Sequence, residues 1–214
     1  MQVQIRPAAH DDLDFVSWVM FTAARSHLER SVWEAMFDRD EAWVRGVLRR
    51  VAVSEQPHWC HLSKFRICEV DGQRAGALAG YDPVTEGTDV LTAAMLEAVA
   101  AAGDADLDLE AVLARADIAD SCTPKKYPGA WGVENVAVVP ELRSRGVLDR
   151  LMENVLAEGR GRGFGHAQIM VLAGNTRAQK AYERNGFAPC AEYRSVAFED
   201  AFTSPGINLL VRAI

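Results

Sequence analysis

The chain has 214 residues, a formal net charge of −7, and 49% hydrophobic and 25% charged residues, which is the composition of a globular protein. The negative charge argues against a nucleic-acid-binding protein, because such proteins usually present a basic surface. No apolar run reaches the length of a membrane span, and the polar, acidic start of the chain does not resemble a signal or transit peptide. Four scattered cysteines without a CxxC pair indicate reduced thiols, so we expect a cytoplasmic protein.

The first part of the chain predicts a strand, two helices and a β-hairpin. Asp71-Gly72 separates two strand-like runs and is a strong tight-turn signal, because glycine adopts positive φ without steric cost. The apolar residues upstream recur at helical spacing. The expected elements are a strand at 3–6, a helix capped by Asp11 or Asp12, a helix at 32–51, and strands at 61–70 and 74–81.

The composition changes between residues 84 and 128. Ala-rich stretches with helical apolar spacing lie on both sides of Gly103, and residues 104–120 carry six acidic side chains against the single Arg115. We expect an acidic helical pair inserted between the third and fourth strands, without a core of its own. The chain is then a single domain over residues 1–214. The charge of the insertion fits either attraction of a cationic amine or an ordinary solvated face.

The second half predicts alternating strands and helices. A strand rich in β-branched residues ends at Pro140, a helix starts near Gly146, and a short helix is stopped by Gly186. Mixed strand and helix order of this kind indicates an α/β (α+β) fold with a mixed sheet rather than a doubly wound one. The expected strands are 132–139, 167–172, 192–198 and 207–212, and the short helix is 176–185.

The most informative segment is the turn between Pro140 and the following helix. Unpaired backbone N–H groups at such a turn lie at the positive end of the helix dipole and form an anion site. Arg143 and Arg145 add cationic donors suited to phosphate, and Gly146 allows close approach of a ligand. Neither a P-loop nor a Rossmann glycine motif is present. Taken alone, the turn fits a diphosphate site or a solvated loop.

A second segment adds Asn175 at a strand end, followed by Ala178, Tyr182 and Gly186-Phe187. Together the two segments resemble the GNAT superfamily of acyl-CoA-dependent N-acyltransferases. That family carries Gln/Arg-x-x-Gly-x-Gly/Ala at the turn and Asn-x-x-Ala-x-x-x-Tyr-x-x-x-Gly-Phe after the next strand. The resemblance is strong over 131–195, weak over 3–82, and does not include the insertion.

The resemblance implies a mixed, mainly antiparallel central sheet flanked by helices. It also implies that acetyl-CoA is the co-substrate and that no metal takes part. The cofactor-binding residues implied are the pantetheine-holding backbone of Val136, Ala137 and Val138, the pyrophosphate-binding turn of Arg143, Ser144, Arg145, Gly146, Val147 and Leu148, and Asn175 on the cofactor arm. Leu148 departs from the family's Gly or Ala, which puts the strength of cofactor binding in question.

Two catalytic residues follow from the resemblance. Tyr182 matches the general acid that protonates the departing thiolate, and a tyrosine is protonated at neutral pH. Its alternative role is that of a core aromatic. Glu134, in the middle of an apolar strand, is the candidate base, because burial raises a carboxyl pKa toward the working range. A structural ion pair or loop cap is the alternative for Glu134. The strand before Asn175 offers His166 but no carboxylate.

The function expected is transfer of an acetyl group to a primary amine in a ternary complex. Alternatives are an acyl-CoA sensor of weak activity, favoured by Leu148, and an acidic interaction domain. The acceptor, a small-molecule or peptide amine, is not specified, and the chain fits a monomer or a homodimer. His58, Cys60 and His61 match no established zinc spacing, so no metal site is expected.

Overall fold

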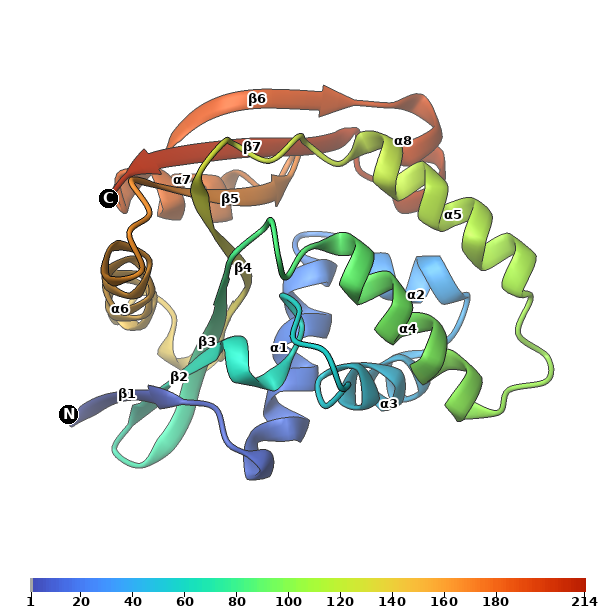
Figure 1. The fold of residues 1–214 in the computed structure, drawn as a ribbon, viewed down its shortest axis with the longest axis horizontal. Helices are drawn as coiled ribbons and strands as arrows, with labels where there is room; N and C mark the ends of the chain where they lie inside the picture. Colours follow the sequence, from blue (N-terminus) through green and yellow to red (C-terminus); the bar gives the residue numbers. More distant parts are fainter. Residues whose placement is uncertain (1) are drawn as a thin grey trace.

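The computed structural model describes residues 2–214, and its centre is one seven-stranded sheet with the order β1-β2-β3-β4-β5-β7-β6 (Figure 1). Every neighbouring pair is antiparallel except β4 and β5, which are parallel. The mixed, mainly antiparallel sheet expected from the sequence is therefore confirmed. The strands are β1 (Val3–Pro7), β2 (Phe65–Val70), β3 (Gln73–Tyr81), β4 (Ala130–Val138), β5 (His166–Leu172), β6 (Ala188–Arg194) and β7 (Gly206–Ala213).

Helices cover both faces of this sheet, and each face has its own apolar core. One core packs α6 and α7 against the sheet, and the other packs the remaining helices, which lie on the right of the sheet in Figure 1. None of the helices within residues 2–214 is both long and apolar enough to cross a membrane. The helices are α1 (Leu13–Arg25), α2 (Val32–Phe37), α3 (Glu41–Val51), α4 (Thr88–Ala102), α5 (Leu109–Cys122), α6 (Val147–Gly161), α7 (Thr176–Arg184) and α8 (Val196–Phe202).

The predicted hairpin turn is confirmed. Asp71 and Gly72 both have positive φ, 50° and 79°, as a two-residue hairpin turn requires. The helix cap is different from the one expected. The Asp12 carboxylate accepts hydrogen bonds from Arg6 and Arg74, each at 2.6 Å, and from the Ala9 N–H, so it does not cap α1. It thereby ties the start of α1 to β1 and β3.

Two element predictions were wrong. The helix expected at 32–51 is divided into α2 and α3, because Asp38 adopts the left-handed conformation and Asp40 caps α3 by accepting from the Trp43 N–H. The strand expected at 192–198 ends at Arg194. There Ser195 caps α8 through its Oγ, and α8 buries Phe198, from the predicted strand, and Phe202, from the predicted loop. Short helices of this kind are stabilised by tertiary burial rather than by local periodicity.

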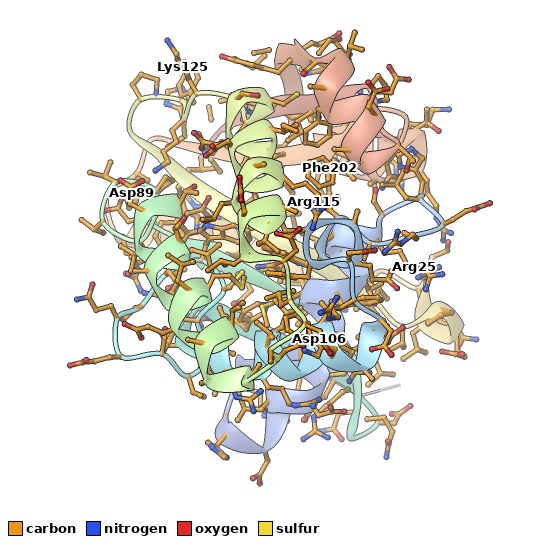
Figure 2. All side chains as sticks on the ribbon, turned by 90° about the vertical axis from the view of Figure 1, so that its right-hand side faces the viewer. Arg25, Asp89, Asp106, Arg115, Lys125 and Phe202 are labelled. Atoms are coloured by element: carbon orange, nitrogen blue, oxygen red, sulfur yellow. The ribbon has the colours of Figure 1, made fainter. Side chains whose placement is uncertain are left out.

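The helical insertion is found between β3 and β4, as expected. Its two helices have different partners, since α4 packs on α3 whereas α5 packs on α2 and α8. An ion pair of 2.7 Å between Arg39 and Asp104 fixes the link between the helices, and Arg115 Nε donates to the Met36 carbonyl at 2.7 Å. Figure 2 looks onto the two helices, with Asp89 near the start of α4 and Asp106 in the turn before α5.

Candidate functional site

The parallel strands β4 and β5 separate halfway along their length. They pair only from Ala130 to Val133 on β4 and from His166 to Ile169 on β5. Beyond that point β4 stays paired with β3, and β5 stays paired with β7. Two strand edges facing each other without a partner therefore border a wedge-shaped gap, into which an extended ligand can place its own hydrogen-bonding groups.

A β-bulge in β4 lies at the point of separation. Ala77 pairs with Ala137 but Ala79 pairs with Glu134, so two residues of β4 oppose one of β3. Asn135 takes φ 55° in this bulge and donates its Nδ2 to the Trp59 carbonyl at 3.2 Å. A bulge bends its strand and redirects its side chains, and bulges often adjoin active sites. Here the bulge turns the second half of β4 away from β5.

One cavity of about 830 Å³ occupies this gap and extends from the turn before α6 to the helices α4 and α5. Eleven of the twelve residues singled out from the sequence line it; the twelfth, Arg145, is exposed and does not line the cavity. The lining residues among them are Glu134, Val136, Ala137, Val138, Arg143, Ser144, Gly146, Val147, Leu148, Asn175 and Tyr182. The fold thus brings together residues up to 48 positions apart (182 − 134).

The turn before α6 carries a run of free backbone donors. Within residues 2–214 the N–H groups from Ser144 to Asp149 form no hydrogen bond, and the first amide bonded at the helix start is that of Arg150, to the Gly146 carbonyl. Ser144 and Gly146 have positive φ, 62° and 78°, which shapes the turn. These amides stand at the positive end of a 15-residue helix, and they fit a diphosphate.

The side chains of Leu148 and Arg143 both contact other parts of the protein. The Leu148 side chain packs against the apolar core under α6 and also lines the cavity. Arg143 Nε donates to the Val138 carbonyl at 3.1 Å, which ties the turn to the end of β4. The turn is therefore anchored to the strand that borders the gap.

Asn175 and Tyr182 belong to α7, on the other side of the gap. The Asn175 Oδ1 caps this helix by accepting from the Ala178 N–H at 3.0 Å, and its Nδ2 donates to Ser26 Oγ at 2.6 Å. Tyr182 is buried and lines the cavity; no hydrogen bond of its hydroxyl is found within residues 2–214, and that oxygen is not among the fully buried atoms without a partner, so it faces the open space. Burial, reinforced by the nearby Glu134, raises the Tyr182 pKa above its ordinary value of 10.0. The phenol therefore keeps its proton at neutral pH and can donate it.

Glu134 lies where β4 leaves β5, on the opposite face of β4 from the apolar Val133. Burial raises its pKa from 4.5 to about 8, and a hydrogen bond from the backbone of Met170 counters this in part. A carboxyl group with a pKa near the working pH can accept a proton during a reaction. His166, the alternative base, lies at the far end of β5, packs against Tyr127 with the two rings tilted by 49°, and does not line the cavity.

Besides Asn135, two buried polar residues of the cavity were not identified from the sequence. Tyr81 at the end of β3 is 3% exposed, and Gln168 in β5 is 2% exposed. Both line the cavity on the face that carries Glu134. The sequence did contain a signal for Gln168, since it is a polar residue in an otherwise apolar strand. A buried polar side chain needs a hydrogen-bond partner, so its presence in such a strand indicates a specific contact.

The pair of histidines near β2 has a structural role. The His58 Nδ1 accepts from the Cys60 N–H at 3.1 Å, and burial lowers the His58 pKa to about 4. The part of the chain that the structure describes has no group of three or more His, Cys, Asp or Glu side chains placed to hold a metal ion.

The arrangement can hold an extended anionic ligand and a second reactant on opposite sides of one gap. A diphosphate fits the turn before α6, and an extended arm fits the free edge of β4. A proton donor on α7 and a proton acceptor on β4 face the same cavity. Such an arrangement is suited to a transfer reaction between two bound molecules.

A protein-family model matches most of the chain. The family described as acetyltransferase (GNAT) family matches residues 26–187 of the chain. No curated protein sequence matches this chain significantly.

Solved structures share the fold at low sequence identity. An acetyltransferase crystal structure superposes with a TM-score of 0.69 at 15% identity, covering 99% of both chains. An N-acetyltransferase from Staphylococcus aureus Mu50 gives 0.65 at 16% identity, covering 97% of this chain and 99% of the other. The N-acetylglutamate synthase from Neisseria gonorrhoeae, solved with coenzyme A and N-acetyl-glutamate, gives 0.51 at 15% identity, covering all of this chain and 35% of the other.

Proposed function

Because this chain belongs to the acetyltransferase (GNAT) family, we propose that it transfers an acetyl group from acetyl-CoA to a primary amine. Both substrates are bound together in the cavity between β4 and β5. The observation that carries this proposal is the coincidence of three features in one cavity. These are the free amides before α6, the unpaired edge of β4, and an acid and a base on its two sides. A merely structural cavity would not require this combination.

The co-substrate is placed by backbone groups. The amides from Ser144 to Leu148 bind its diphosphate, with Arg143 and Arg145 adding positive charge. Its pantetheine arm lies along Val136–Val138 as an additional strand, which places the thioester near the bulge. The N–H of Val138 polarises the acyl carbonyl and stabilises the oxyanion that develops there. Asn175 orients the arm from the side of α7.

The transfer balances without a further reactant. The acceptor ammonium loses its first proton to solvent, the neutral amine nitrogen attacks the carbonyl carbon, and Glu134 accepts the second proton that this nitrogen releases as it becomes an amide. A C–N bond forms, the C–S bond breaks, and Tyr182 donates its proton to the departing thiolate. The products are an N-acetyl amide and the free thiol of coenzyme A. Glu134 then loses its proton to solvent and Tyr182 regains one.

Two measurements test the proposal in order. Acetyl-CoA should raise the thermal midpoint, since a ligand that binds only the native state stabilises it. A panel of primary amines should then release thiol from acetyl-CoA in a protein-dependent way. A midpoint shift without thiol release from any amine would instead favour an acyl-CoA-binding sensor. Absence of both would refute the proposal.

A further inference from the structure

Three polar side chains meet on the acceptor side of the cavity. Tyr81 and Gln168 both pair with Gly132, from the strands on either side of it, and Glu134 lies two residues further along the same strand. Two residues of a strand span about 7 Å, and neighbouring strands lie about 5 Å apart. Tyr81 and Gln168 therefore lie about 10 Å apart across β4, with Glu134 about 7 Å along that strand, and all three side chains are on one face of the sheet.

Gln168 presents a hydrogen-bond donor to that space. Its Oε1 accepts from the Tyr127 backbone N–H at 2.6 Å, which fixes the amide orientation because a backbone N–H can only donate. No hydrogen bond of the Gln168 Nε2 or of the Tyr81 hydroxyl is found within residues 2–214, and neither atom is among the fully buried polar atoms without a partner, so both face the open space of the cavity. Donors that face a cavity without a protein acceptor can bind an oxygen atom supplied by a ligand.

The outer wall of the same cavity is apolar. Leu96 on α4 and Leu113 on α5 line it and are 42% and 44% exposed. The two helices pack on different neighbours, and they diverge in front of the sheet in Figure 2. Trp33 and Met95 extend this wall inward. A bulky apolar group placed between the helices would be removed from water by these side chains.

The charges around this part of the cavity are mainly negative. Asp89, Asp117 and Asp120 line the cavity from α4 and α5, next to Lys126, which donates to the Pro83 carbonyl. The other lining cations, Arg143, Arg177 and Arg184, belong to the turn before α6 and to α7. Residues 84–128 hold nine acidic and three basic side chains, a net −6 of the total −7. This field favours an ammonium group and disfavours a free carboxylate.

We propose that the acceptor is an α-amino amide with a bulky apolar side chain. Its amine lies at Glu134, its carbonyl oxygen accepts from Gln168, and its side chain lies between α4 and α5. This inference rests on the proposed acetyl transfer, and it names the substrate class of that same site. The negative field sets this acceptor apart from a free amino acid, whose carboxylate would be repelled.

Four acceptors separate the features of the proposal. Phenylalaninamide has all of them, whereas glycinamide lacks the apolar side chain, phenethylamine lacks the carbonyl, and phenylalanine carries a carboxylate. We expect phenylalaninamide to exceed glycinamide in kcat/KM by about 10- to 100-fold, the value of burying a Phe-sized side chain. It should exceed phenethylamine by roughly fivefold, the value of one hydrogen bond. Equal rates with glycinamide and phenylalaninamide would overturn the proposal.

A matched pair of variants tests the apolar wall. Leu113 and Leu109 lie on the same helix with almost equal exposure, 44% and 45%, but only Leu113 lines this cavity. Leu113→Asn should lower kcat/KM for phenylalaninamide about tenfold and leave glycinamide unchanged. Leu109→Asn should affect neither acceptor. Equal effects of the two substitutions would contradict the placement of the side chain.

The role of Gln168 is tested with the ratio of kcat/KM for phenylalaninamide to kcat/KM for phenethylamine. This ratio does not change if part of the variant protein is unfolded. Gln168→Leu should abolish the preference for phenylalaninamide over phenethylamine, and an unchanged preference would remove Gln168 from recognition. A tetrapeptide that begins with phenylalanine carries the same α-amino amide. Its turnover, relative to that of phenylalaninamide, distinguishes a peptide amino terminus from a free amide as the source.

Acceptor binding can be measured without turnover. Trp33 and Trp59 line the cavity, so their fluorescence should respond to phenylalaninamide in the presence of coenzyme A. Binding of phenylalaninamide without acetyl transfer would refute the proposed reaction and leave the acceptor class supported. Acetyl transfer to other amines without binding of phenylalaninamide would refute the acceptor class alone.

Discussion

The raised pKa of Glu134 gives the sharpest test of the site. With a pKa of about 8, roughly a tenth of the carboxyl groups are ionised at pH 7 and a hundredth at pH 6. If Glu134 is the base, kcat/KM should rise about tenfold per pH unit below pH 8. Glu134→Gln should remove this rise. The assay is thiol release with an amine that is already neutral across this range, so that the acceptor's own titration does not contribute.

The same group gives a second, independent measurement. Between pH 4.5 and about 8 the folded protein keeps a proton on Glu134 that the unfolded chain releases. The folded state binds more protons there, so the unfolding free energy contributed by this group falls as pH rises through the window. The interval corresponds to at most about 5 kcal/mol, at about 1.4 kcal/mol per pH unit.

The glutamine in Glu134→Gln has no titrating proton, so this variant should not lose unfolding free energy from position 134 as the pH rises. Its urea unfolding free energy, measured relative to that of the wild type, should therefore increase between pH 5 and pH 8.5. Other titrating groups cancel in the difference between the two proteins. A constant difference across this range would show that the carboxyl is ionised normally, and a pH–rate profile shared by both proteins would eliminate Glu134 as the base.

The remaining predictions concern other parts of the site and the fold. Tyr182→Phe should lower kcat by about 100-fold or more with an unchanged Kd for acetyl-CoA in calorimetry, because it removes only the proton donor; unchanged turnover would exclude that role. Leu148→Ala should change the same Kd by less than about threefold, or ~0.7 kcal/mol, since the diphosphate is held by backbone amides; marked tightening would show that the leucine obstructs the turn. Asp12→Asn should destabilise the protein to urea by about 3–5 kcal/mol, because it leaves two guanidinium groups without their buried partner. Gly132→Ala should cost about 1–3 kcal/mol, since its Cβ would lie 2.3 Å from the Tyr81 ring, and normal stability would contradict that close packing.

The sequence predicted turns and helix ends correctly where neighbouring residues alone determine them. Asp71-Gly72 forms its turn because two consecutive positive-φ residues need little beyond their own backbone. The turn before α6 is specified in the same way, by Gly146 and by amides that a helix start leaves unpaired. Asn175 caps its helix through its own side chain.

Long-range packing decided the elements that were wrong. Residues 32–51 have a continuous helical pattern, yet the chain breaks at Asp38 so that α2 and α3 can pack separately on α1. Residues 196–202 form a helix because Phe198 and Phe202 are buried together, with ring centroids 4.8 Å apart. Neither preference is visible in a local window, since it depends on which surface the segment meets.

The sequence by itself therefore determined the sheet class, the inserted helices, the turn of free amides before α6 and the family resemblance, because backbone geometry and residue spacing encode them. Tertiary structure alone decided which side chains face the space proposed for the acceptor. Tyr81, Glu134 and Gln168 lie on three different strands, and only strand pairing brings them to one face beside Gly132. The pKa of Glu134 depends on the same pairing, because desolvation is a property of the assembled neighbours rather than of the residue.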